Sequence, residues 1–204
     1  VVYSFHTYGG EVKAVRDVSY EVRQGEILGI VGESGCGKSV TAQCILRLNP
    51  EPPGFFEGGE ILYKGQDVLK MSKKEIRKIR GREIGFVFQD PMTSLNPTMR
   101  VGAQIEEVFL GRTDVSKKEV KERAMDIMRL VGISDVEKRY KQYPHELSGG
   151  MKQRVMIAIA LVSRPSVIIC DEPTTSLDVT IEAQILDLLL ELREKLGTSI
   201  IMIT

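Results

Sequence analysis

The chain has 204 residues, of which 42% are hydrophobic and 27% charged, a composition ordinary for one globular domain with room for an attached subdomain. Lys plus Arg equals Asp plus Glu at 28 each, so no net field favours nucleic acid or an anionic membrane, which still leaves room for a local basic patch. No apolar run approaches the roughly 20 residues of a membrane helix, so we expect any membrane association to come through a partner.

The first part of the chain, up to about Tyr63, is predicted to form short strands joined by turns. Residues 1–5 and the imperfect alternation of residues 12–22 indicate two strands. Residues 27–31 are a short, β-rich apolar run without polar alternation, which predicts a strand buried on both faces. Pro50, Pro52, Pro53 and Gly54 mark one loop, and Gly58-Gly59 mark another.

Two helices of the middle segment begin with capping boxes, in which a Ser and a Glu three residues later bond the first helical turn. The first opens at Ser72 and ends near residue 80, and the second opens at Ser116 and is stopped by Gly132. Between them, residues 84–88 predict a strand, whereas residues 91–97 hold too many helix breakers for regular structure.

The C-terminal part alternates helices and strands. A helix that begins near Gly150 leads to an apolar strand over residues 167–170, and an apolar helical stripe over residues 181–196 leads to a strand over residues 199–204. Parallel strands joined by crossover helices predict an α/β core. The mostly helical segment 91–160 is predicted to be an insertion into that core.

Residues 32–39 match the phosphate-binding pattern G-x-x-x-x-G-K-[ST], directly after one predicted strand and before a helix predicted over residues 39–48. Glycines let the backbone curl so that its N–H groups point at phosphate oxygens, and the helix N-terminus adds its positive dipole end. We expect Lys38 to reach the β- and γ-phosphates and the Ser39 hydroxyl to bind Mg²⁺. The predicted nucleotide contacts here are Gly32, Glu33, Ser34, Gly35, Cys36, Gly37, Lys38, Ser39 and Val40.

A second acidic centre follows the apolar strand at residues 167–170. Asp171 lies at the C-terminal edge of the sheet, where ligands of open α/β folds bind, and it is predicted to be a partner of Mg²⁺. Glu172 points the other way and is predicted to polarise the water that attacks the γ-phosphate. Downstream of an intact phosphate-binding loop, we prefer this interpretation to an ordinary acidic surface turn.

Further motifs, in register with these two centres, resemble the ABC (ATP-binding cassette) ATPase family over essentially the whole chain. Leu147-Ser148-Gly149-Gly150-Met151 resembles the ABC signature, with Met151 where many members carry Gln. Gln89 resembles the Q-loop glutamine, and Asp171-Glu172-Pro173 followed by Thr174-Thr175-Ser176-Leu177-Asp178 resembles Walker B running into the D-loop. Tyr8 resembles the A-loop aromatic residue that stacks on adenine, with Phe5 as the less favoured choice.

The resemblance implies an α/β P-loop NTPase with an N-terminal antiparallel β subdomain and an inserted α-helical subdomain. It implies an ATP-binding core over residues 1–90 and 161–204 and a helical signature subdomain over residues 91–160. ATP and Mg²⁺ are the implied cofactors, and the implied catalytic residues are Glu172, Lys38 and Gln89.

The resemblance also implies a second ATPase subunit, identical or related. Ser148, Gly149 and Gly150 would cap the γ-phosphate of ATP held by that subunit, since a helix N-terminus binds an anion without a side-chain charge. Asp178 would align the dimer interface, although an ordinary helix cap is the competing interpretation. Gln89 would touch Mg²⁺ or the attacking water and signal to a membrane partner.

Residues 88–97, 143–147 and 178–184 resemble the ATPase subunits of oligopeptide, dipeptide and nickel importers. The implied function is ATP hydrolysis that powers peptide import, with nickel or another small solute as the alternative cargo. The implied partners are two integral membrane permease subunits and an extracytoplasmic solute-binding protein, and the implied location is the cytoplasmic face of the cell membrane. Family members carry a C-terminal extension, sometimes with an iron–sulfur cluster.

A nucleic-acid-associated ABC ATPase is the alternative of another class. The interval between Gln89 and Ser148 holds no sustained heptad run, and only one cassette is present, so no nucleic-acid partner is expected. Because the sequence begins without Met and stops at Thr204, each time inside a predicted strand, we expect a fragment or the ordered part of a longer chain. The H-loop histidine of the family would follow Thr204, and a chain without it is expected to bind ATP and hydrolyse it poorly. His6 and His145 are expected to be ordinary polar residues.

Overall fold

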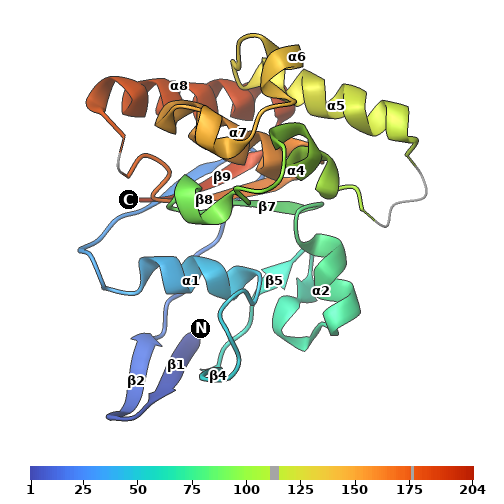
Figure 1. Cartoon of the computed structure of the whole chain (residues 1–204). Helices are drawn as coiled ribbons and strands as arrows, with labels where there is room; N and C mark the ends of the chain where they lie inside the picture. Colours follow the sequence, from blue (N-terminus) through green and yellow to red (C-terminus); the bar gives the residue numbers. More distant parts are fainter. Residues whose placement is uncertain (111–114, 176) are drawn as a thin grey trace.

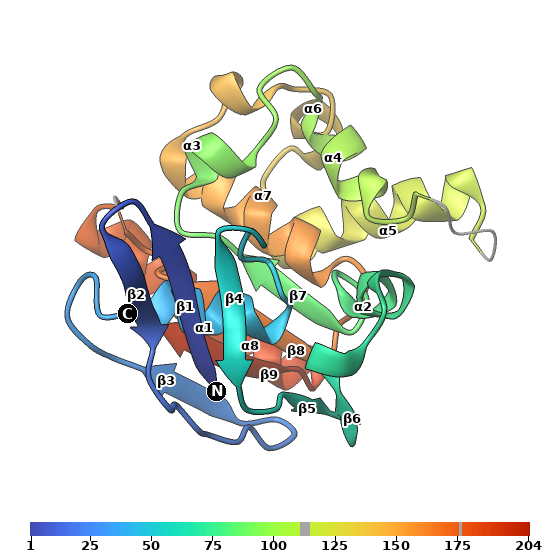
Figure 2. The same ribbon diagram turned by 90° about the horizontal axis from the view of Figure 1, so that it is seen from below.

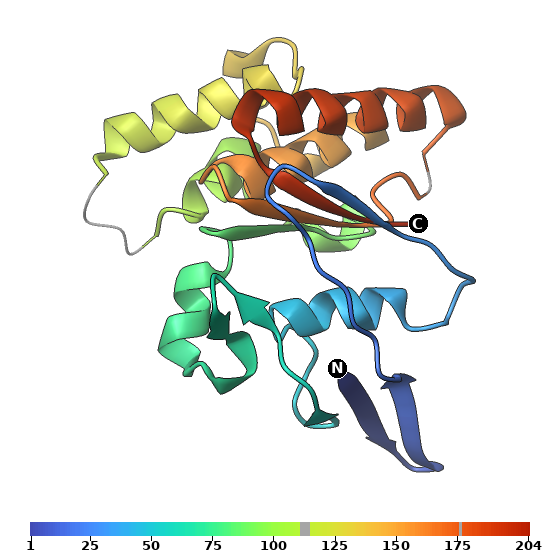
Figure 3. The ribbon, with the colours of Figure 1, turned by 180° about the vertical axis from the view of Figure 1, so that it is seen from behind.

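The computed structural model describes residues 1–110, 115–175 and 177–204. Its centre is a parallel sheet with the strand order β3 (Ile27–Ile30), β9 (Ser199–Ile203), β8 (Val167–Asp171) and β7 (Ile84–Val87). Helix α1 (Lys38–Ile45) lies on one face of this sheet, and α7 (Gly149–Leu161) and α8 (Val179–Leu196) cover the other face (Figures 1 and 3). The predicted α/β core is therefore confirmed.

A second, antiparallel sheet lies beyond α1, as the view in Figure 2 shows. Its strand order is β2 (Gly10–Val15), β1 (Val2–Thr7) and β4 (Gly54–Gly58). The hairpin of β5 (Leu62–Tyr63) and β6 (Gln66–Asp67) follows, with a 3₁₀ turn at Val68–Lys70 and helix α2 (Lys73–Ile79). The capping box predicted for α2 is present in full. This sheet confirms the predicted N-terminal antiparallel β subdomain.

The helices between β7 and β8 gather above one end of the parallel sheet (Figure 1). They are α3 (Pro91–Ser94), α4 (Val101–Glu107), α5 (Lys117–Leu130), α6 (Val136–Arg139), a 3₁₀ turn at Pro144–Glu146, and α7. Ser116 caps α5 by accepting from the Glu119 backbone N–H, and Gly132 takes a left-handed φ of 75° just after α5 ends. Helix α7 packs on β7 as well as on α3, α4 and α5.

One buried apolar cluster joins the helical segment to the sheet. It includes Val87, Ile168 and Ile200 from the strands, together with Ile157 of α7 and Leu189 of α8. Each of these five side chains is at most 1% exposed, so the helical segment and the sheet share one core. The boundaries between the ATP-binding core and the helical subdomain, placed after residues 90 and 160, remain a prediction.

Three local predictions were wrong. Pro91–Ser94 is a short helix, because the Asp90 carboxylate accepts from the Met92 N–H at 2.7 Å and Pro91 is pre-organised for the first helical position. Strand β3 is not buried on both faces: Gly29 is exposed and the other three residues are half-buried, and β3 is an edge strand that pairs only with β9 among the described residues. The strand predicted over residues 12–22 ends at Val15.

Gly85 is where β7 passes closest to α7. A Cβ at this position would lie 2.4 Å from the Ala160 carbonyl oxygen, which belongs to backbone that cannot move aside cheaply. We expect Gly85→Ala to lower the free energy of unfolding by about 1–3 kcal/mol, measured by urea denaturation. Gly29→Ala is the matched control, since nothing lies within 4 Å of its added Cβ. Equal urea midpoints for the two variants would refute the close packing.

Candidate functional site

The phosphate-binding loop connects β3 to α1, as predicted. Gly35 and Gly37 have φ angles of 79° and 98°, in the left-handed region that favours glycine. Gly37 is also the N-cap of α1 and has no side chain to bond the first N–H groups, so these donors face the loop. A Cβ on Gly37 would lie 2.3 Å from the Ala14 carbonyl oxygen, so the loop needs glycine there to pack under β2.

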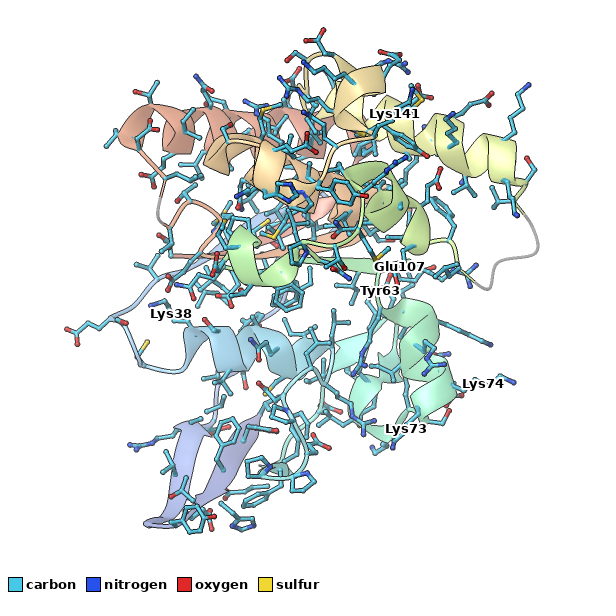
Figure 4. All side chains as sticks on the ribbon, viewed as in Figure 1. Lys38, Tyr63, Lys73, Lys74, Glu107 and Lys141 are labelled. Carbon is cyan, nitrogen blue, oxygen red and sulfur yellow. The ribbon has the colours of Figure 1, made fainter. Side chains whose placement is uncertain are left out.

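Lys38 is buried at the start of α1, at the place labelled in Figure 4. Its Nζ donates to the Gly32 carbonyl oxygen at 2.6 Å and to the Glu33 carbonyl oxygen at 3.0 Å. The same Nζ lies 4.0 Å from Glu172 Oε1. The loop thus surrounds the buried ammonium group of Lys38, which lies close to Glu172, the acidic residue that follows β8.

Asp171 ends β8 next to the phosphate-binding loop. The Ser39 hydroxyl donates to Asp171 Oδ1 at 2.8 Å, across 132 residues of sequence. Burial raises the pKa of the Asp171 carboxyl, the hydrogen bond from Ser39 opposes this shift, and the charge of Glu172 adds to it. A hydroxyl and a carboxylate side by side are oxygen ligands of the kind that Mg²⁺ prefers.

The raised pKa of Asp171 has a consequence for stability. Between the ordinary value of 3.8 and the raised value, the folded chain binds a proton that the unfolded chain releases, so stability falls as pH rises through this window. We expect Asp171→Asn to raise the melting temperature of the nucleotide-free chain at neutral pH, with the gain vanishing below about pH 3.8. Asp187→Asn, an exposed change on α8, is the control. A lower melting temperature of Asp171→Asn at neutral pH would contradict this account.

Glu172 follows Asp171 directly and has a φ of 44°, in the left-handed region of backbone conformation. Its Oε2 accepts from Gln89 Nε2 at 2.6 Å and from Thr175 Oγ1 at 3.1 Å. Gln89 lies two residues after the end of β7 and Glu172 follows β8 directly, so the parallel pairing of these strands brings the two residues together. Asp171 and Glu172 thus have different partners, and Glu172 is bonded to Gln89, while the opposite orientations of the two acidic residues remain a prediction.

A cavity of about 690 Å³ opens over the loop. Its wall on the loop side contains Gly35, Cys36, Gly37, Lys38, Ser39, Val40, Thr41 and Glu172. Its other wall comes from β2 and the segment after it, and consists of Val12, Lys13, Ala14, Val15, Arg16 and Val18. Lys13 and Arg16 were missed by the sequence reasoning, because only the folding of the antiparallel sheet over the loop brings them there. The bond of Thr175 to Glu172 was also missed, although Thr175 lies only three residues after Glu172 in the chain.

Several predicted residues do not line this cavity. Tyr8 is fully exposed in the turn between β1 and β2, and Phe5 packs its ring edge-on against Tyr3 at 5.3 Å. Ser148 caps α7 through the Met151 N–H at 3.4 Å, and Asp178 caps α8 through the Ile181 N–H at 3.0 Å. In the single chain, Asp178 therefore acts as the N-cap of α8, as the competing interpretation had it.

The signature segment and the start of α8 lie side by side. A Cβ on Gly150 would lie 2.9 Å from Ile181 Cγ2, and one on Gly149 would lie 3.7 Å from Leu177 Cδ2. The two helix N-termini are therefore held together, away from the loop of the same chain. Ser176, within the predicted D-loop, lies outside the described residues.

His6 and His145 were expected to be ordinary polar residues. His6 stacks on Phe55 at 4.2 Å and His145 stacks on Tyr143 at 5.7 Å, which fits ordinary structural roles. Cys44 and Cys170 are buried free thiols, and Cys36 is exposed in the loop. Within the described ranges, no three His, Cys, Asp or Glu side chains cluster as a metal centre. None of the helices in that part of the chain is long and apolar enough to cross a membrane.

Comparison with known proteins shows which family has these motifs. The model of the family described as "ABC transporter" matches residues 15–175, which contain both the phosphate-binding loop and the acidic pair. The chain belongs to the ABC transporter family.

Curated ABC relatives are similar over nearly all of the chain. It is 58% identical over 201 residues to the oligopeptide transport ATP-binding protein OppD of Bacillus subtilis, covering 98% of this chain and 56% of that protein. It is 52% identical to the dipeptide transport ATP-binding protein DppD of the same organism, covering 98% of this chain and 60% of that protein. The chain thus spans somewhat more than half the length of these relatives.

A solved ABC structure shows the same fold. The dimeric ATP-binding cassette MJ0796, bound to ADP and Pi in a post-hydrolysis state, superimposes with a TM-score of 0.86 at 30% identity. The alignment covers 100% of this chain and 85% of the cassette. The fold predicted from the resemblance to ABC ATPases is therefore confirmed.

Proposed function

We propose that the chain binds and hydrolyses ATP to power the import of di- or oligopeptides through a membrane transporter. The observation that carries this proposal is the meeting of Lys38, Ser39, Asp171, Glu172 and Gln89 at one phosphate-binding loop. Peptide cargo is supported by the names of the relatives OppD and DppD, both peptide transport ATP-binding proteins.

The proposed chemistry is hydrolysis of the bond between the β- and γ-phosphates. Lys38 would exchange its two carbonyl acceptors for phosphate oxygens, and the backbone N–H groups at the start of α1 would hold the same anion. Mg²⁺, held by the Ser39 hydroxyl and the Asp171 carboxylate, would neutralise charge on the phosphate oxygens.

Glu172 is the proposed general base. A water positioned by Glu172 Oε2 and the Gln89 side chain would attack the γ-phosphorus, its proton would pass to Glu172 Oε2, and ADP would leave with the bond electrons. The 2.6 Å contact between Gln89 and Glu172 supports a shared role, because it holds both polar groups at the end of the same pair of strands. Lys13 and Arg16 are proposed to border the nucleotide on the β2 side.

The signature segment is proposed to act on a second ATPase subunit. Ser148, Gly149 and Gly150 do not line the cavity of their own chain, and the N-terminus of a helix such as α7 presents backbone N–H groups and a positive dipole end suited to an anion. A head-to-tail dimer would bring this N-terminus to the γ-phosphate bound by the partner, and Asp178 would lie at the same contact. The related cassette MJ0796, which is dimeric, supports this arrangement.

The remaining proposed partners are two integral membrane permease subunits and an extracytoplasmic solute-binding protein, with the ATPase at the cytoplasmic face of the membrane. We would reconstitute the full-length protein with its genomically neighbouring permease and binding proteins, and compare ATP hydrolysis with peptide mixtures and with nickel. Stimulation by peptides is expected. Stimulation by nickel alone would keep the ATPase and overturn the peptide assignment.

A further inference from the structure

Positive charge is concentrated at one corner of a chain that has no net charge. Residues 70–82 contain seven Lys and Arg against one Glu, whereas the whole chain has 28 residues of each sign. This segment comprises α2 and its flanks and lies away from the phosphate-binding loop, at the opposite end of α1 (Figure 1). Catalysis as proposed above gives this charge no role.

The cations of α2 point to one side of the helix. Lys73, Lys74, Arg77 and Lys78 fall within an arc of about 140° at 100° per residue, whereas Ile76 and Ile79 on the other side are buried. In Figure 4 the labelled side chains of Lys73 and Lys74 extend from α2 away from the body of the molecule. We call Lys73, Lys74, Arg77, Lys78 and Arg82 the α2 basic face; all five are exposed.

Among the described residues, these cations form no ion pairs of the kind that other helices of the chain contain. On α5 and α8, exposed Lys and Arg pair with Glu one turn away, as in Arg123–Glu119 and Lys195–Glu191. In the described part of the chain, no residue of the α2 basic face has a carboxylate within the 4.0 Å of an ion pair. Glu75, the acidic residue of α2, is taken up by the capping box, where it accepts from the Ser72 N–H at 2.8 Å.

The α2 basic face is fixed to the rest of the fold. Arg80 donates from Nε to the Leu46 carbonyl oxygen at 2.9 Å and from a terminal nitrogen to the Arg47 carbonyl oxygen at 2.5 Å. Arg47 in turn donates to the Met71 carbonyl oxygen at 2.8 Å. Burial lowers the pKa of the Arg80 guanidinium, and the charges of Arg47 and Arg77 lower it further, which reflects the positive potential at this corner.

We propose that the α2 basic face binds the anionic phospholipid headgroups of a membrane surface. Its residues are mainly Lys, form no part of the cavity above the loop, and offer no aromatic ring for stacking on a base. Strand β5 lies beside α2 (Figure 1). Leu62 of this strand is 60% exposed and adds the apolar side chain that membrane-surface sites pair with cations. The proposal is independent of ATP hydrolysis, so its failure would leave the proposed ATPase function untouched.

The test is co-sedimentation of the full chain with vesicles of equimolar phosphatidylcholine and phosphatidylglycerol, and with vesicles of phosphatidylcholine alone. The triple variant Lys73→Gln, Lys74→Gln, Lys78→Gln removes three charges from the face and leaves Arg80 and the capping box intact. Each lost charge is expected to weaken binding about fivefold, or roughly 100-fold for the three. The matched control, Lys117→Gln, Lys118→Gln, Lys141→Gln, removes the same charge from exposed positions of the helical segment.

The expected result is binding to the mixed vesicles only, weakened by salt and lost in the α2 variant but kept in the control. Equal losses in both variants, or equal binding to both kinds of vesicle, would overturn the proposal. Circular dichroism melting of each variant separates loss of binding from loss of fold. Tighter binding of a short DNA duplex than of the mixed vesicles at the same ionic strength would also overturn it, in favour of a nucleic-acid partner.

Discussion

Glu172→Gln is expected to lower kcat for ATP hydrolysis by about 10²–10⁴-fold while leaving ATP affinity nearly unchanged. The amide keeps the shape of the side chain and can still contact Gln89 and Thr175, but it cannot take a proton from water. Phosphate release by the full-length protein in its assembled transporter measures the rate, and equilibrium binding of a fluorescent ATP analogue measures the affinity.

Glu191→Gln is the matched control for this change. Glu191 is exposed on α8, where it pairs with Lys195 far from the phosphate-binding loop, and its replacement should leave hydrolysis at the wild-type rate. A Glu172→Gln protein that hydrolyses ATP within a few-fold of the wild type would remove Glu172 from the role of general base.

Lys38→Met is expected to weaken ATP binding by roughly 10- to 100-fold, the effect of losing a charge-assisted hydrogen bond to phosphate. Met has a similar length and fills the buried space, but it provides neither the charge nor the donors that now bond the Gly32 and Glu33 carbonyls. Isothermal titration with ATP and Mg²⁺ measures the change, and melting temperature without nucleotide shows whether the loop still folds.

Lys13→Met is the informative comparison for Lys38. Lys13 lines the same cavity from β2 but is half exposed and pairs with Glu57. Its replacement by Met should therefore weaken ATP binding by only a few-fold. If the two variants lose the same affinity, the centre of phosphate binding has been placed wrongly.

Local sequence was enough to predict most elements, because their signals are short-range. The Ser72–Glu75 capping box, the glycines of the phosphate-binding loop and the apolar run at 167–170 each act within a few residues. The errors lie where a distant or neighbouring side chain intervenes. The carboxylate of Asp90 converts the breaker-rich segment after it into a helix, and the exposure of β3 depends on which strands pair with it.

The amino-acid sequence was enough to predict which kinds of side chain the candidate site contains, since the glycine pattern, Lys38, Ser39 and the acidic pair each form a short local motif. Which of these groups meet depends on the tertiary structure. The register of β7 on β8 joins Gln89 to Glu172, and the antiparallel sheet folds Lys13 and Arg16 over the loop while leaving Tyr8 outside. Such contacts join residues far apart in the chain, as Ser39 and Asp171, which are 132 residues apart, and strand pairing and layer packing fix them rather than any local pattern.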